Sequence, residues 1–180
     1  FMDYLGLNVE DVTWSYTVTG VNGKERKLSL DGRIIIDKIP DSEIRDRCVV
    51  WMMQVADNLE LANPIRKAIT GIVFEVRQGY KSKDSKRQNA DIANAANAYA
   101  NGYIPCLMVM SSQIDDDIVS RYSIAKWVIL QGIMDVSPYT STFSFFKKVI
   151  GFDFVEFMNN NHGYFQERIH FVLKQLMGAE

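Results

Sequence analysis

Hydrophobic and polar residues alternate in a stretch near the start of the chain, SYTVTGVNGKERKLSLDGRIIID. Apolar residues lie at 16, 18 and 21 before Asn22-Gly23, and the alternation resumes at 28 and 30 after it. This pair is the strongest two-residue turn signal, so the stretch predicts a β-hairpin. After Asp31-Gly32 comes a second short apolar run at residues 34–36, which predicts that the strand bends there and continues.

The pattern then changes to a period of 3.6 residues. Apolar residues recur with that spacing from 44 to 59, which predicts an amphipathic helix. Asp41 or Ser42 would be its N-cap, because short polar side chains satisfy the first free backbone N–H groups. Pro64 breaks this helix or starts the next one.

A strand, a helix and a second strand follow. The apolar run ending in FEVR predicts a buried strand over 72–77, and IPCLMVMSS predicts another over 104–112. Between them lies an alanine-rich helix that Asp84 or Ser85 can cap and that ends at Gly102. Two strands joined by a helix form a parallel pair, so the sheet is expected to be mixed and covered by helices.

The remaining segments complete an α/β fold. DDDIVSRYSIAKW predicts a short helix and WVIL a third buried strand at 127–130, whereas residues 138–180 are helical with a break at Gly151. We expect one domain over 1–180, with the helical tail 138–180 packing on the core or forming a dimer face. The opening FMDYLG is not a natural initiator context, which fits a tag remnant or a fragment that lacks an N-terminal portion.

Composition narrows the class of protein. Of the 180 residues, 47% are apolar and 23% charged, which is typical of a globular domain, and no apolar stretch is long enough for a membrane span. Cys48 and Cys106 lie in apolar surroundings and are expected to pack in the core rather than form a disulfide or bind metal. These features favour the cytoplasm.

Positive charge is concentrated in one segment. Residues 66–87 hold seven bases and two acids, a net charge of +5 in a chain of net charge −2. Focused positive charge attracts phosphates, so we expect a nucleic-acid partner, although each lysine alone could belong to a solvated helix face.

Two carboxylates lie close to this segment in the predicted sheet. Asp31 comes where the strand bends, Glu75 comes in the strand that precedes the basic residues, and both are expected to lie within apolar strands, where an unpaired charge is costly. Two acids on neighbouring strands repel unless a cation lies between them, and one or two carboxylates with phosphate oxygens suit Mg²⁺. Arg77, two residues after Glu75, shares its face of the strand.

This arrangement resembles the Asp-x(n)-Glu-x-Lys motif of the PD-(D/E)xK nuclease superfamily, with arginine in place of the lysine. The chain is similar to type II restriction endonucleases of that superfamily over residues ~28 to ~130, and the tail SFFKKVIGFDFVEFM is similar to their C-terminal segments. The spacing resembles the subgroup that cuts CCGG-type sites. In that subgroup an RSDR-x-QN-like stretch starts the helix after the catalytic strand, and SKDSKRQNAD takes that place here.

The resemblance implies a restriction-endonuclease-like fold and a Mg²⁺-dependent, sequence-specific double-stranded DNA endonuclease. Such an enzyme would be a homodimer in a prokaryotic restriction–modification system and would leave 5′-phosphates. Asp31 and Glu75 would bind the metal, and Arg77 would complete the catalytic motif. The residues that would contact DNA bases or phosphates are Lys81, Lys83, Asp84, Lys86, Arg87 and Asn89.

Several alternatives stay open at this stage. Arg77 has a bulkier, permanently protonated head, so it could supply only charge, with Lys81 or Lys83 reaching in from the loop, or it could mark an inactivated chain. A silent DNA-binding or partner subunit and a repair or junction nuclease are therefore alternative functions. Each carboxylate also has a structural explanation that needs no metal. Glu75 could be a charge on an edge strand that pairs with Arg77 or Lys86, and Asp31 could be a turn residue. Asp41 in the literal Pro-Asp pair is a rival metal ligand, but is better explained as a helix cap.

Overall fold

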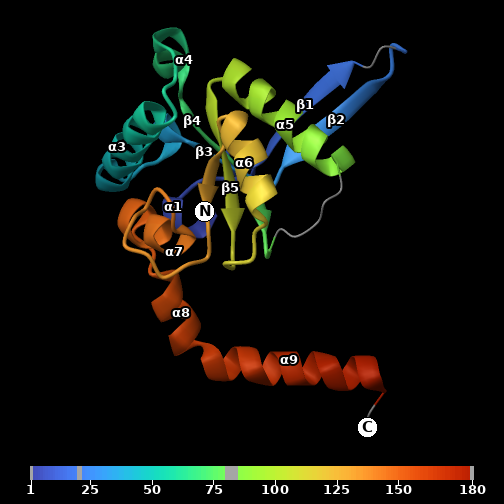
Figure 1. Cartoon of the computed structure of the whole chain (residues 1–180). Helices are drawn as coiled ribbons and strands as arrows, with labels where there is room; N and C mark the ends of the chain where they lie inside the picture. Colours follow the sequence, from blue (N-terminus) through green and yellow to red (C-terminus); the bar gives the residue numbers. More distant parts are fainter. Residues whose placement is uncertain (1, 20–21, 80–84, 179–180) are drawn as a thin grey trace.

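A four-stranded mixed sheet forms the centre of the molecule (Figure 1). The computed structural model describes residues 2–19, 22–79 and 85–178. The strand order is β3-β4-β5-β6, with β3 antiparallel to β4 and the other neighbours parallel. These strands are β3 (Gly32–Ile35), β4 (Gly71–Arg77), β5 (Tyr103–Val109) and β6 (Val128–Leu130). The predicted α/β class and mixed sheet are confirmed.

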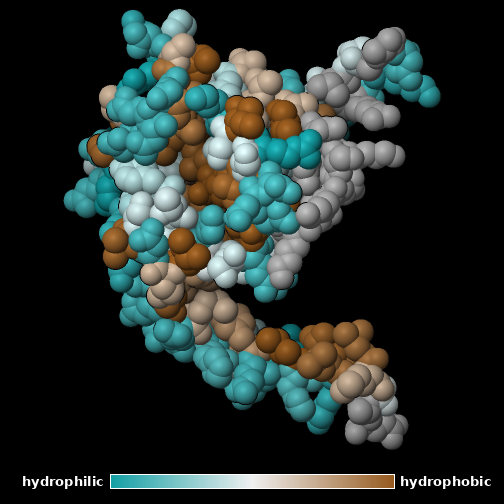
Figure 2. All heavy atoms as spheres, in the orientation of Figure 1, coloured by the Kyte–Doolittle hydropathy of each residue, from teal (hydrophilic) through white to brown (hydrophobic). Residues whose placement is uncertain are grey.

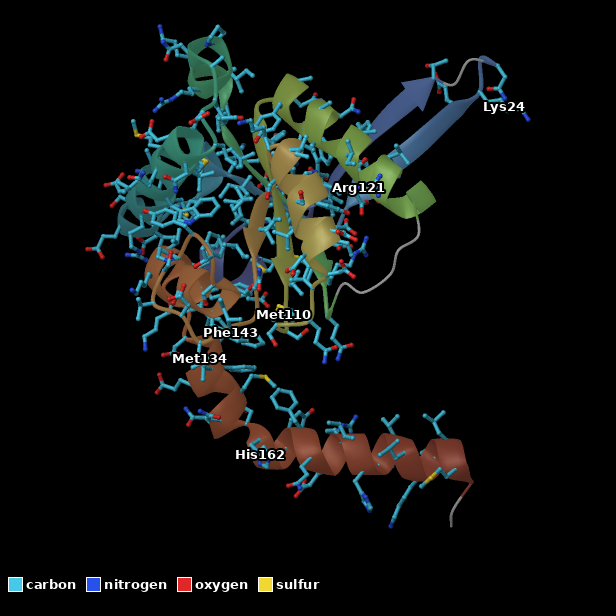
Figure 3. The ribbon with its side chains drawn as sticks, in the orientation of Figure 1. Lys24, Met110, Arg121, Met134, Phe143 and His162 are labelled. Atoms are coloured by element: carbon cyan, nitrogen blue, oxygen red, sulfur yellow. The ribbon has the colours of Figure 1, made fainter. Side chains whose placement is uncertain are left out.

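The predicted hairpin is confirmed as a separate two-stranded sheet. It consists of β1 (Trp14–Thr19) and β2 (Glu25–Leu30), paired antiparallel from Trp14 opposite Leu30. Near its tip, the Asn22 side chain accepts a hydrogen bond from the backbone N–H of Lys24, and Gly23 has the positive φ of 73° that such a turn requires. Figures 1 and 3 show this hairpin, with Lys24 at its far end, extending beyond the central sheet.

One face of the sheet is covered by α3 and by the first part of the tail. Helix α3 (Ser42–Asn58) starts as predicted, because the Asp41 carboxylate accepts a hydrogen bond from the backbone N–H of Ile44 at 3.0 Å. Its buried side chains, including Trp51, pack on strand residues such as Phe74 and on Phe145. The other elements in or beside this layer are α1 (Met2–Leu5), η1 (Ile36–Lys38), α4 (Asn63–Ala68), α7 (Thr142–Phe145) and η2 (Phe146–Ile150).

The opposite face is covered by α5 (Ser85–Ala100) and α6 (Asp116–Ile124). Ala95 and Ala98 of α5 are buried and belong to the same cluster as Val73, Leu107 and the side chains of α6, so the small residues let the helix lie close to the sheet. Gly102 follows α5 with φ of 77°. A Cβ there would lie 2.5 Å from the Ala68 carbonyl oxygen, so the close approach also requires glycine.

One predicted strand end was wrong, and two short helices were not predicted. Strand β5 ends at Val109 rather than at residue 112, because the backbone leaves the sheet as a turn before α6. The helices α1 and α2 (Val9–Val12) were not predicted, since four residues are too few to show a period. The run of three aspartates starts α6, as expected: Asp115 is the N-cap and accepts a hydrogen bond from the backbone N–H of Asp117 in the first turn.

The tail divides into a packed part and a projecting part. Phe145, Val149 and Ile150 are buried in the core. After Gly151, with φ of 89°, come α8 (Phe154–Asn160) and α9 (His162–Met177), which extend away from the rest of the molecule (Figure 1). Among the described helices, none has the length and apolar character needed to cross a membrane.

Candidate active site at the end of strand β4

Glu75 and Arg77 lie on the face of β4 that α5 and α6 cover. Alternation along the strand puts Ile72 and Phe74 in the α3 cluster and Val73 in the opposite cluster, so Glu75 and Arg77 follow Val73. Glu75 is only 6% exposed and forms an ion pair with the Arg77 guanidinium. The predicted pairing with Arg77 is therefore confirmed, but the edge-strand interpretation was wrong, because β4 lies between β3 and β5.

Asp31 lies at the bend between β2 and β3, next to the end of β4. The antiparallel pairing of β3 with β4 ends with Gly32 opposite Phe74, so Asp31 and Glu75 are each the next residue beyond the last pair. The Asp31 Oδ2 accepts a hydrogen bond from the backbone N–H of Val76 at 2.8 Å. Asp31 is exposed and precedes the strand, so the expectation that it lies within an apolar strand was wrong.

A third carboxylate, which the sequence analysis missed, comes from α5. Asp91 is 5% exposed, and its Oδ2 lies 4.0 Å from Nη2 of Arg77. The same oxygen accepts a hydrogen bond from the Tyr122 hydroxyl of α6. We call Glu75, Arg77, Asp91 and Tyr122 the Arg77 cluster. It joins β4, α5 and α6 through charged and polar groups inside an otherwise apolar layer.

The hairpin adds a further polar contact next to the Arg77 cluster. The Tyr16 hydroxyl donates a hydrogen bond to Oδ1 of Asn94, which is buried on α5. The pKa of Tyr16 is raised above its ordinary value, mainly because the side chain is partly buried. A hydrogen bond with Asn97 opposes this rise, and the negative charge of Asp91 adds to it. The hairpin therefore makes a direct polar contact with α5.

A sequence signal for Asp91 existed. Asp91, Ala95 and Ala98 are spaced i, i+4, i+7, which is one face of a helix. The two alanines predict that this face is buried, and an acid on a buried face needs a partner. Tyr122 gave a weaker signal, as it follows Ile118 by four residues on the buried face of α6.

All six of the predicted DNA-contacting side chains lie outside what the structure describes. Lys81, Lys83 and Asp84 fall between 79 and 85. The backbone of Lys86, Arg87 and Asn89 belongs to the first turns of α5, but their side chains lie outside the description. Their placement at the helix start is confirmed for the backbone, and their contact with DNA stays a prediction.

The carboxylates fit a magnesium ion that completes its shell with other oxygens. Nowhere in 2–19, 22–79 and 85–178 do three or more His, Cys, Asp or Glu side chains gather as a metal-binding group. Mg²⁺ is commonly held by one or two carboxylates together with water and substrate phosphates. Asp31 uses one oxygen for Val76, and a carboxylate has acceptor capacity beyond one such bond. Asp31 and Glu75 are thus a suitable donor pair.

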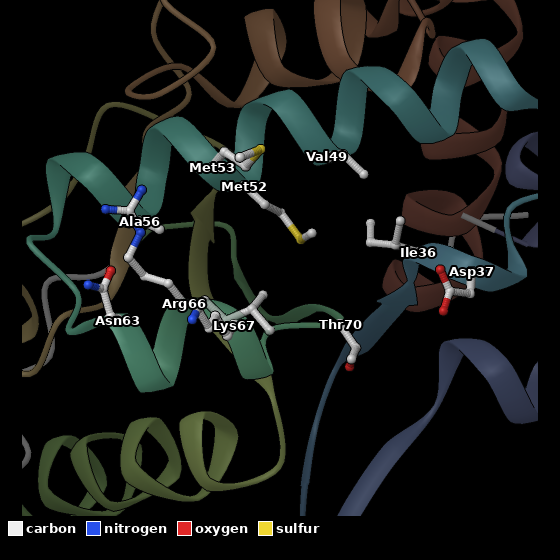
Figure 4. A pocket seen from close by; sticks show the side chains of 11 residues that line it. Ile36, Asp37, Val49, Met52, Met53, Ala56, Asn63, Arg66, Lys67 and Thr70 are labelled. Carbon is white, nitrogen blue, oxygen red and sulfur yellow. The ribbon is translucent and has the colours of Figure 1, made fainter.

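A cleft of about 560 Å³ lies on the other side of the sheet, between α3 and α4 (Figure 4). Its apolar lining includes Met52, Met53 and Ile36, and Arg66 and Lys67 of α4 contribute positive charge. Arg66 pairs with Asp57 at 2.5 Å. None of the residues that line the cleft belongs to the Arg77 cluster, so the two features are separate.

The comparisons with known proteins add no relative. No protein-family model matches the sequence, no curated protein matches it, and no solved structure matches the fold.

Proposed function

We propose that the chain is a Mg²⁺-dependent, sequence-specific double-stranded DNA endonuclease with a restriction-endonuclease-like fold. The observation that carries the proposal is Glu75, a buried carboxylate at the end of a central strand, with the Asp31 carboxylate hydrogen-bonded to Val76, the next residue of that strand. Burying a carboxylate is costly unless its charge is used or compensated. Buried charged groups clustered at the end of a strand are a common mark of an active site.

Each residue of the site has a distinct part in the proposed reaction. Asp31 and Glu75 would hold the ion, and the Asp31–Val76 hydrogen bond fixes the Asp31 carboxylate on β4. A magnesium ion supplies an activated water and offsets the charge that develops on the scissile phosphate. Arg77 would contribute positive charge beside the phosphate, and Asp91 would hold its guanidinium through the ion pair.

The basic residues at the start of α5 would bind the DNA. A helix N-terminus attracts phosphate, and α5 begins eight residues after β4 ends. Arginine and lysine can read guanine, asparagine can read adenine, and aspartate can accept from cytosine. Lys81, Lys83, Asp84, Lys86, Arg87 and Asn89 supply these groups in one short stretch.

A silent DNA-binding subunit is the second candidate. It is favoured by the ion pair between Glu75 and Arg77, because the guanidinium compensates the buried carboxylate with no metal. In that case the Arg77 cluster would serve folding only. A repair or junction nuclease shares the same site and differs in its substrate.

Digestion of plasmid DNA distinguishes these functions. The full chain is incubated with supercoiled plasmid and Mg²⁺, and the ends of the products are sequenced. A restriction role predicts 5′-phosphate ends at one short sequence, in a chain that would work in the prokaryotic cytoplasm. Scattered or structure-dependent ends would support the repair or junction nuclease, and intact plasmid with retained DNA binding would support the silent subunit.

A further inference from the structure

Helix α9 carries an apolar face that no other part of the described chain (2–19, 22–79 and 85–178) covers. None of its residues is buried. Figure 2 shows apolar side chains gathered on this projecting helix, beyond the surface of the main body. Six apolar residues form one stripe along it, and five of them are between 48% and 78% exposed: Ile169, Val172, Leu173, Leu176 and Met177, with Phe165 half-buried at the start.

The apolar stripe of α9 has the spacing of a helix-pairing seam. Phe165, Ile169, Val172 and Leu176 are separated by four, three and four residues, which is the a/d pattern of helices that pack along each other. The charged residues Glu167 and Lys174 lie on the opposite side of the helix. A charge-free seam can meet an identical seam without repulsion.

We propose that α9 pairs with α9 of a second copy of this chain, in antiparallel orientation about a two-fold axis. An antiparallel pair centred between His170 and Phe171 brings Phe165 opposite Leu176 of the other copy, and Ile169 opposite Val172. Every seam residue then meets an apolar partner, which is the self-complementarity that a two-fold interface demands.

The orientation follows from where the body of the molecule lies. Helix α9 joins the body only at its N-terminal end, through α8 (Figure 1). Phe157 of α8 packs on Phe165 with ring centroids 6.1 Å apart, which sets the start of the seam. An antiparallel pair places the two bodies at opposite ends of a helix about 24 Å long, whereas a parallel pair brings both to the same end.

The area of the stripe is sufficient for a dimer. From their exposed fractions, the side chains of the stripe present about 500 Å² of apolar surface. A standard interface buries about 800 Å² per partner, and somewhat more than half of that area is apolar, so the two areas are similar. A membrane surface is a poorer occupant, because helices that lie on membranes carry a polar face rich in lysine and arginine. Helix α9 has only two such residues, Arg168 and Lys174, together with one acid, Glu167.

Analytical ultracentrifugation of the full chain, without DNA, tests the pairing. We expect a mass twice the 20.6 kDa of the chain at concentrations of tens of micromolar. Ile169→Glu/Val172→Glu should return the chain to a monomer. The matched control Tyr164→Glu/Phe171→Glu adds the same charge at exposed positions outside the seam and should remain a dimer. Circular dichroism of each variant checks that the fold persists.

Cross-linking tests the orientation, since both natural cysteines are buried. Phe165→Cys and Leu176→Cys chains, one carrying a longer tag, are mixed and oxidised. Antiparallel pairing predicts the mixed disulfide, whereas disulfides between like chains would overturn the orientation. A monomeric wild-type chain, a dimer that survives the double seam variant, or a monomer that binds anionic vesicles through α9 would overturn the pairing. Because DNA is absent, these outcomes leave the proposed nuclease activity untouched.

Discussion

The Asp31 carboxylate accepts a hydrogen bond from the backbone N–H of Val76 at 2.8 Å, which ties the bend before β3 to the residue that follows Glu75. This contact holds the Asp31 carboxylate on β4, beside the residue that follows Glu75, as the proposed metal site requires. The same bond has a purely structural value as well, so variants must separate the two.

Asp31→Asn and Asp31→Ala separate the roles of Asp31. Asparagine keeps an oxygen that can accept from Val76, so the free energy of unfolding should stay within about 0.5 kcal/mol of wild type, whereas alanine should cost about 1 kcal/mol. Both variants lack the carboxylate and should lose cleavage. Urea unfolding and plasmid digestion are the two measurements. Full cleavage by Asp31→Asn would remove Asp31 from the metal site.

Much of the fold could be predicted because its elements are long and periodic. Helix α3 shows four turns of 3.6-residue spacing and a capping aspartate, and the β4–α5–β5 order follows from two apolar runs around an alanine-rich helix. The Arg77 cluster was only half predictable. Glu75 and Arg77 are two residues apart on one strand, so their pairing could be predicted. Asp91 and Tyr122 come from two different helices, and the contacts of Asp91 with Arg77 and Tyr122 depend on how these helices pack on the sheet.

Removal of Arg77 should destabilise the fold. In Arg77→Met, Glu75 and Asp91 would remain buried with like charges, and the free energy of unfolding should fall by roughly 2–4 kcal/mol at pH 7. The double variant Glu75→Gln/Arg77→Met removes one of those charges and should recover part of the loss. Chemical unfolding of the single and double variants gives the coupling energy. Strict additivity of the two substitutions would contradict the ion pair.

Tyr122 should stabilise the Arg77 cluster through its hydroxyl alone. Tyr122→Phe keeps the ring in the core and removes the hydrogen bond to Asp91, which should lower the free energy of unfolding by about 1–2 kcal/mol. The control is Tyr164→Phe, because Tyr164 is 60% exposed on α9. Equal stability of the two variants would mean that the Asp91 contact contributes nothing.

Both cysteines should be protected from reagents in the folded chain. Burial raises the pKa of the Cys48 thiol to about 11 and also raises the pKa of Cys106. At pH 8 a thiol-specific reagent should therefore label both quickly in denaturant and neither in native buffer. The raised pKa of Cys48 contributes stability that is present below pH 9 and is lost as the pH rises toward 11. Cys48→Ala should weaken that pH dependence, and rapid labelling of the native chain would contradict the burial.

The basic residues at the start of α5 should show two kinds of contact with DNA. Lys81→Ala should weaken binding to all sequences about equally and lower the salt slope by roughly one unit, as a phosphate contact does. Arg87→Ala or Lys86→Ala should cost about 1–3 kcal/mol for the cognate site and little for random DNA. Binding of cognate and scrambled duplexes in Ca²⁺ over a salt series measures both. Uniform losses would mean that the segment only holds the backbone.

The most direct test compares the wild-type chain with Glu75→Gln on the same DNA. Glutamine keeps the size of the side chain and removes the charge that a metal ion needs. With Mg²⁺, the wild-type chain should cut plasmid DNA at a defined sequence and stop cutting when the ion is chelated, while Glu75→Gln should bind that sequence in Ca²⁺ and leave it intact. Cleavage by Glu75→Gln at the wild-type rate, or a wild-type chain that binds DNA and never cuts it with Mg²⁺, would contradict the proposed nuclease.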